Sequence, residues 1–174
     1  ALKITKKDSQ LGAEVQGDAP NLSATFEVVN NDDKATKTLI APDGTWYTAG
    51  PHEAFEYKIH TDEAGNFQSP AEFLEYGEYT VSEIEAPVGY EGTTTTRTIN
   101  IENEGDSFEI EYTNEAKRGT FSLQKLNAET GKRSNGGTDL QISFEVYNRS
   151  THNVVVNGHT YAPGEVCYTN RTNK

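Results

Sequence analysis

The stretch Tyr79-Thr-Val-Ser-Glu-Ile-Glu-Ala-Pro-Val-Gly-Tyr90 decides how the rest of the chain is interpreted. Its first half alternates, so that Tyr79, Val81 and Glu83 share one face of a predicted strand. The Ala-Pro-Val-Gly segment then ends the strand, because proline removes a backbone donor and glycine permits a turn. Glu83 is the unusual member, since an unpaired carboxylate on an apolar face is costly. Either Glu83 is solvated, or it is buried for a chemical reason.

Composition favours an all-β chain and argues against several classes of function. The 174 residues include 9 Tyr, 7 Phe and 15 Gly, and no long stretch has helical periodicity. A net charge of −12 argues against nucleic acid as a partner. No apolar run has the length of a bilayer span, and no targeting or lipidation motif occurs. Because even position 1 is not Met, we interpret the chain as a piece of a longer protein.

Short alternating segments separated by turn signals predict a β-sandwich. The Pro42-Asp-Gly44 sequence, between two short apolar runs, predicts a hairpin. We expect an antiparallel sandwich of the immunoglobulin-like kind. The predicted strands are 2–7, 24–29, 38–40, 45–47, 55–59, 79–85, 97–101 and 107–114.

An interrupted internal repeat predicts two domains. Residues 1–116 carry 7 basic and 23 acidic side chains (net −16), whereas residues 117–174 carry 8 and 4 (net +4). The pattern of Leu2 to Lys6 returns at Thr120 to Lys125, and Phe26-Glu-Val28 returns at Phe144-Glu-Val146. The second copy ends before any counterpart of the Glu83 strand. We therefore expect a complete sandwich over 1–116, followed over 117–174 by the N-terminal portion of a second one.

Three strands each place one polar residue at the inward position of an apolar face. Lys6 follows Leu2 and Ile4, Glu83 follows Val81, and Asn114 follows Tyr112. Any one of them, near a strand end, is most simply explained by a side chain that reaches water. That explanation is weaker for all three together, because Lys6 and Asn114 lie on the first and last strands of the same predicted domain.

These residues carry a resemblance to a known family. Leu2-Lys-Ile-Thr-Lys-Lys-Asp8, the Tyr79–Tyr90 stretch and Tyr112-Thr-Asn114 resemble the first strand, glutamate box and last strand of the Cna B-type (prealbumin-like) domains of Gram-positive surface adhesins and pilins. The resemblance implies an isopeptide bond between Lys6 and Asn114, with Glu83 as the catalytic acid. Leu123-Gln-Lys-Leu-Asn-Ala-Glu-Thr-Gly-Lys132 is similar to the opening of another such domain, which gives Lys125 the position of a reactive lysine without a partner in this chain.

The implied chemistry depends on burial. Desolvation lowers the pKa of a lysine, so that Lys6 can act as a neutral amine nucleophile. Protonated Glu83 would bond to the Asn114 carbonyl, polarise it and relay protons to departing ammonia. The reaction happens once in each molecule and is not enzymatic turnover. Lys7 has the opposite parity and is expected to face solvent, and Glu85 is expected at an exposed rim.

The resemblance also implies a role and a location. We expect a structural stalk module in the cell wall of a Gram-positive bacterium, outside the cell, whose partners are neighbouring domains of the same surface protein. The alternative is a sandwich that binds a host protein or glycan through exposed aromatic side chains. Its candidate residues are Trp46, Tyr47, Phe55 and Tyr57.

The third hypothesis is a hydrolase or a metal enzyme, and few features of the sequence support it. No nucleophile elbow, phosphate-binding loop or zinc pattern occurs, so no metal or cofactor is expected. The histidines show no ligand spacing, and the nearest approach to a site is His60 beside Asp62 and Glu63. Cys167 is the single cysteine, which excludes an intrachain disulfide, and we interpret it as an ordinary strand residue. The four histidines are His52, His60, His152 and His159.

Overall fold

Every regular element in the described part of the chain is a β-strand, which confirms the all-β prediction. The computed structural model describes residues 1–31, 37–40, 46–49, 55–71, 74–135, 138–139 and 141–171. The chain divides into unit 1, residues 1–15 and 19–117, and unit 2, residues 16–18 and 118–174. Over those same ranges, no helix has the length and apolarity that a membrane crossing requires.

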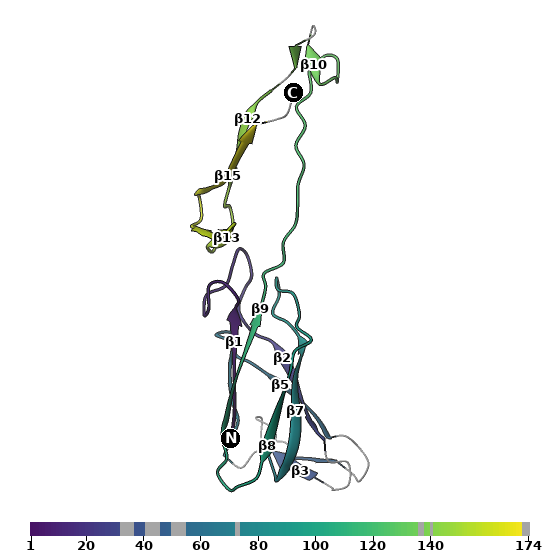
Figure 1. Ribbon diagram of the computed structural model, residues 1–174, viewed down its shortest axis with the longest axis vertical. Coiled ribbons are helices and arrows are strands. Elements are labelled where there is room, and N and C mark those ends of the chain that lie inside the picture. Colours follow the sequence, from purple (N-terminus) through teal and green to yellow (C-terminus); the bar gives the residue numbers. More distant parts are fainter. Residues whose placement is uncertain are drawn as a thin grey trace. The chain divides into compact units, whose positions relative to one another are not determined.

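Unit 1 is built from two sheets that share one core (Figure 1). The three-stranded sheet has the order β6-β1-β9, the four-stranded sheet has the order β5-β2-β7-β8, and β3 pairs with β4 in a separate hairpin. The Asp-Gly tip predicted for that hairpin lies outside the described residues. The strands are β1 (Leu2–Asp8), β2 (Thr25–Asn30), β3 (Lys37–Ile40), β4 (Trp46–Ala49), β5 (Phe55–His60), β6 (Asn66–Gln68), β7 (Gly77–Glu85), β8 (Thr96–Ile101) and β9 (Phe108–Asn114).

The first and last strands of unit 1 are neighbours and run parallel. The register places Leu2 beside Phe108, Lys6 beside Tyr112 and Asp8 beside Asn114. The other strand pairs of unit 1 are antiparallel. β6, a strand that the sequence did not predict, pairs with the other edge of β1. β1 is therefore held between two strands, so that its inward side chains face the middle of the sandwich.

Apolar side chains from both sheets fill the space between them. Phe26 of the four-stranded sheet packs on Tyr112 of the three-stranded sheet, with 4.8 Å between the ring centroids. The Tyr112 hydroxyl donates a 2.7 Å hydrogen bond to the carbonyl of Val81 across the core. Leu2 and Ile4 of β1 are fully buried in the same cluster. The alternation that predicts the strands thus also predicts their buried faces.

Unit 2 consists of strand pairs with a sparse apolar interior. β12 (Ser143–Tyr147) pairs with β15 (Val166–Arg171), β13 (Val154–Val156) with β14 (His159–Tyr161), and β10 (Ser134–Asn135) with β11 (Thr138–Asp139). Phe144 contacts Phe121 and Tyr168 at centroid distances of 6.4 and 6.3 Å, yet Phe121 is 62% exposed. The segment from residue 120 to 125, which repeats the pattern of β1, forms no strand. No strand within the described ranges pairs with it, and a strand needs a paired neighbour.

Candidate functional site

Lys6 lies inside the sandwich because of its parity on β1. Along that strand, Leu2, Ile4, Lys6 and Asp8 are buried, and the residues between them are half-buried. The Lys6 side chain is completely inaccessible to solvent. Its Nζ atom donates a 3.2 Å hydrogen bond to the carbonyl of Tyr112, its neighbour on β9. The long aliphatic stem therefore lies in the core, and the amine is directed along β9.

Glu83 enters the same space from the opposite sheet. It sits on β7 opposite Phe26, where the β2–β7 register shifts and two β7 residues oppose one residue of β2. Such irregularities redirect side chains. Here Ile84 is 46% exposed, while the Glu83 side chain is only 1% exposed. The strand that the sequence identified as unusual therefore buries its carboxylate.

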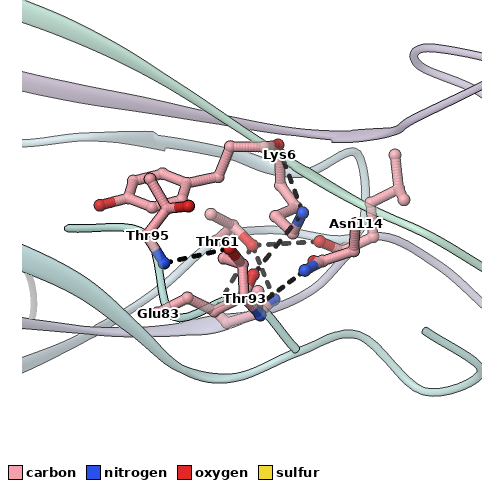
Figure 2. Close-up of polar contacts among 9 residues, drawn as sticks. Lys6, Thr61, Glu83, Thr93, Thr95 and Asn114 are labelled. Atoms are coloured by element: carbon pink, nitrogen blue, oxygen red, sulfur yellow. Dashed lines mark hydrogen bonds and ion pairs between the residues drawn. The ribbon is translucent and has the colours of Figure 1, made fainter. Parts of the chain in front are cut away.

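The two oxygens of Glu83 face two different nitrogens (Figure 2). Oε2 lies 3.6 Å from Lys6 Nζ. Oε1 accepts a 2.9 Å hydrogen bond from Nδ2 of Asn114 and a 3.2 Å hydrogen bond from the backbone N–H of Thr93. Asn114 is 3% exposed, at the end of β9. One carboxylate thus lies between an amine and a primary amide, all three of them buried.

The buried position of Lys6 favours the neutral form of its amine, compared with a lysine exposed to solvent. Burial lowers the pKa of Lys6 below its ordinary value, although the nearby carboxylates of Glu83 and Asp8 oppose that shift. Burial also raises the pKa of Tyr112 to about 12, so its hydroxyl stays protonated and keeps its hydrogen bond to Val81. The site therefore combines an amine with a lowered pKa and a tyrosine whose position is fixed by its hydrogen bond to Val81.

Two buried oxygens of the site make no hydrogen bond within the described residues: Oδ1 of Asn114 and Oε2 of Glu83. Buried polar atoms normally have partners, so each exception needs a reason. Oε2 faces Lys6 Nζ at 3.6 Å, which is beyond hydrogen-bond distance. Oδ1 belongs to the amide whose nitrogen is held by Glu83. Both exceptions fall on the groups that a transfer reaction would change.

The structure brings together Lys6, Glu83 and Asn114, the three residues predicted from strand parity. One contact differs from the expectation: the Asn114 nitrogen faces Glu83, where the sequence argument placed the carbonyl oxygen. Lys7 lies on the outer face and pairs with Glu111 at 2.6 Å, and Glu85 is exposed.

Several contacts of the site were not foreseen. They are the Tyr112 carbonyl, the Thr93 N–H and the buried carboxylate of Asp8. Asp8 shares the parity of Lys6, which is a usable signal. The two backbone contacts depend on the register between strands, which a sequence does not display.

The candidate residues of the alternative hypotheses do not form a common site within the described residues, and several of their side chains are not described. Lys125 is exposed in unit 2. His60 Nδ1 lies 2.9 Å from the Thr25 hydroxyl, and Cys167 Sγ lies 3.3 Å from the carbonyl of Val146. No cluster of three or more metal-ligating side chains occurs among the described residues. The side chains of Trp46, Tyr47, Phe55 and Tyr57, and the whole of His52, lie outside the described set.

Comparisons with solved structures match the chain to several bacterial proteins. The Bacillus anthracis TIE protein is 21% identical with a TM-score of 0.57, and the match covers 99% of this chain and 24% of that one. The backbone protein of the group B streptococcus pilus 2b is 19% identical (TM-score 0.43; 66% and 40% covered). The minor pilin of Streptococcus agalactiae is 17% identical (TM-score 0.42; 71% and 47% covered). The chain thus spans about a quarter of the first protein and less than half of each pilin.

The family comparison concerns unit 1. No curated protein matches the chain. The family described as SpaA, prealbumin-like fold domain, matches residues 1–116, which is two thirds of the chain and includes Lys6, Glu83 and Asn114. The expectation of a prealbumin-like domain is thereby confirmed, and the chain belongs to the SpaA family of prealbumin-like fold domains.

Proposed function

We propose that unit 1 is a self-cross-linking structural module, in which Lys6 and Asn114 form an isopeptide bond with the help of Glu83. The observation that carries the proposal is the position of the Glu83 carboxylate. One of its oxygens faces the candidate nucleophile at 3.6 Å, and the other bonds the candidate leaving group at 2.9 Å. The side chain is 1% exposed, so solvent does not compete for either contact.

The proposed reaction is an amide exchange. The neutral Lys6 amine attacks Cγ of Asn114, a new C–N bond forms, the bond from Cγ to Nδ2 breaks, and ammonia leaves. Glu83 accepts a proton from Nζ through Oε2 and delivers a proton to Nδ2 through Oε1. The amine begins with two protons, keeps one in the new amide and transfers the other to the departing nitrogen. Holding the groups together can contribute about 7–11 kcal/mol to such a step.

The role that follows is mechanical and not enzymatic. The bond joins the strands at the two ends of unit 1, and each molecule reacts once. Prealbumin-like domains of this family and the pilin fold support a stalk module in a longer protein on the surface of a Gram-positive cell, with neighbouring domains as its partners. We place the protein outside the cell, in the cell wall. Residues 117–174 would begin a second domain of the same kind, with Lys125 in the place of Lys6.

Intact mass tests the proposal. The wild-type chain should be about 17 Da lighter than its sequence, the mass of one ammonia, and Glu83→Ala should have the full mass of its own sequence. Glu85→Ala is the matched control, because it removes an exposed carboxylate from the same strand, and it should keep the deficit. A wild-type chain of full mass would refute the bond, and a deficit in Glu83→Ala would refute the role of Glu83.

A further inference from the structure

A second buried carboxylate lies beside the site and is not used by the proposed reaction. Asp8 is 2% exposed and follows Lys6 on the inward face of β1. Its Oδ1 accepts hydrogen bonds from the backbone N–H groups of Gln10 and Leu11, at 2.7 and 2.8 Å. Its Oδ2 accepts a 2.9 Å hydrogen bond from the hydroxyl of Tyr90. We call this last contact the Asp8–Tyr90 clasp.

The clasp joins three chain segments at the reactive end of unit 1. Tyr90 forms a β-bridge with Ala116, two residues after Asn114. On either side of that bridge, Glu91 N–H donates to the Glu115 carbonyl and Lys117 N–H to the Gly89 carbonyl, both at 2.8 Å. The loop after β7 is thus bound to the end of β9 by backbone hydrogen bonds, and to β1 by the Tyr90 hydroxyl.

The same loop also orients the catalytic acid. Thr93, three residues after Tyr90, donates its backbone N–H to Oε1 of Glu83. On the other side, Ser9 N–H donates a 2.9 Å hydrogen bond to the carbonyl of Asn114, so the residue after Asp8 is bound to the electrophile's own backbone. Lys6 is therefore two residues from Asp8, Asn114 is two residues from the β-bridge at Ala116, and Glu83 is bonded to Thr93, three residues after Tyr90.

Tyr90 is placed firmly enough to act as an anchor. It is 2% exposed and packs with Ala19 and Leu22 in a small core separate from the main one. Gly89 precedes it with φ 90°, and a Cβ at that position would lie 3.2 Å from the Cβ of Ala19. A positive φ combined with such close packing favours glycine at this position. The loop therefore has a fixed path from the strand to Tyr90.

We infer that the Asp8–Tyr90 clasp is a positioning device for bond formation, an inference that rests on the proposed function. Intramolecular reactions lose much of their advantage when the reacting atoms are displaced by about 1 Å. The clasp fixes the ends of β1 and β9 and the loop that holds Glu83, so its loss lets the three groups drift. Asp8 and Tyr90 are positioning residues, because neither contacts the atoms that react.

The rate of bond formation tests the inference. Chains labelled in a short isotopic pulse of cell-free synthesis would be quenched in acidic denaturant at timed intervals and weighed. We expect Tyr90→Phe to slow the mass loss about tenfold and still reach the full deficit. Tyr79→Phe is the matched control, because it removes another core hydroxyl that donates to a backbone carbonyl, that of Glu75, and we expect less than about a twofold change.

A double-mutant cycle of Tyr90→Phe and Asp8→Asn tests whether the slower bond formation is caused by loss of the contact between Asp8 and Tyr90. The Asp8→Asn single variant and the double variant both lose the direct charge effect of Asp8 on Lys6, so this loss cancels in the coupling. The double variant should be no slower than the slower single variant. Thermal unfolding of Glu83→Ala with and without Tyr90→Phe measures any effect on folding in chains that cannot react.

Each outcome is decisive. An unchanged rate in Tyr90→Phe, an equal loss in Tyr79→Phe, losses that multiply in the double variant, or a rate loss explained by a larger unfolded fraction would overturn the inference alone. A wild-type chain that never loses ammonia would overturn it together with the proposed function.

Discussion

Replacing Asn114 with alanine separates the contribution of the cross-link from that of the buried polar groups. The variant loses the electrophile but keeps the Lys6–Glu83 pair, whose side chains are 0% and 1% exposed. A bond from residue 6 to residue 114 closes a loop of about 100 residues, which the chain-entropy model values at roughly 4–5 kcal/mol of unfolding free energy. The hydrogen bond that Nδ2 of Asn114 donates to Glu83 adds nothing to this difference, because Nδ2 leaves as ammonia when the cross-link forms.

The loop-closure term corresponds to a large thermal shift. At roughly 3–6 °C for each kcal/mol in a domain of this size, Asn114→Ala should lower the Tm of unit 1 by about 12–30 °C. The fluorescence of Trp46, the single tryptophan and a residue of unit 1, provides the signal. Glu83→Gln is the companion variant, because it also prevents the bond but keeps the Asn114 amide. A fall of only a few degrees, in a wild type shown by mass to be cross-linked, would refute the chain-entropy reasoning.

Four further predictions concern the candidate site, a closely packed glycine and unit 2. The rate of bond formation should rise with pH and level off below pH 10.5, the ordinary lysine pKa, because burial lowers the pKa of Lys6; timed mass measurements that level off only above it would contradict this. For the same reason, unreacted Asn114→Ala should gain stability in denaturant titrations as pH rises from the lowered Lys6 pKa to 10.5, since the unfolded chain then binds more protons. Gly65→Ala should destabilise unit 1 more than Gly105→Ala does. Both glycines have positive φ, but of the two only Gly65 would bring its Cβ against backbone, 2.5 Å from the Lys6 carbonyl oxygen. Equal losses of unfolding free energy would show that the strain of the positive φ alone matters. Lys125 should remain a free amine in the monomer. Detection of a cross-linked peptide containing Lys125 by tandem mass spectrometry would contradict this prediction.

Strand parity was sufficient to find the three residues of the candidate site, because the two-residue period of a strand is a local property. Lys6, Glu83 and Asn114 are each at the inward position of an apolar face, and each is buried. Parity does not give the register between distant strands. Asn114 lies beside Asp8 and not beside Lys6, an offset that only the pairing of β1 with β9 determines. The clasp depends on that offset and could not be read from the sequence.

The second copy of the pattern shows the limit of local signals. Thr120 to Lys125 alternates as Leu2 to Lys6 does, yet it forms no strand. Phe144 occupies the repeat position of Phe26, which is fully buried under Tyr112, but Phe144 remains partly exposed. A strand needs a neighbour for its backbone and a facing sheet for its side chains. The described part of unit 2 supplies neither for the segment from residue 120 to 125.

The parallel pairing of β1 and β9 gives the proposed bond its mechanical meaning. Two residues of a strand span about 6.6 Å, which separates the β9 neighbour of Lys6, Tyr112, from Asn114. The lysine stem covers this offset along the strand, and the Tyr112 carbonyl holds its amine on the way. In unit 1 the chain enters at the start of β1 and leaves at the end of β9, at opposite ends of the pair (Figure 1). A pull on these ends would pass from residue 6 to residue 114 through the covalent bond, while the intervening strands stay unloaded. Without the bond, the same pull would shear the β1–β9 hydrogen bonds directly, so under the proposed function the resistance of unit 1 to tension would depend on the cross-link.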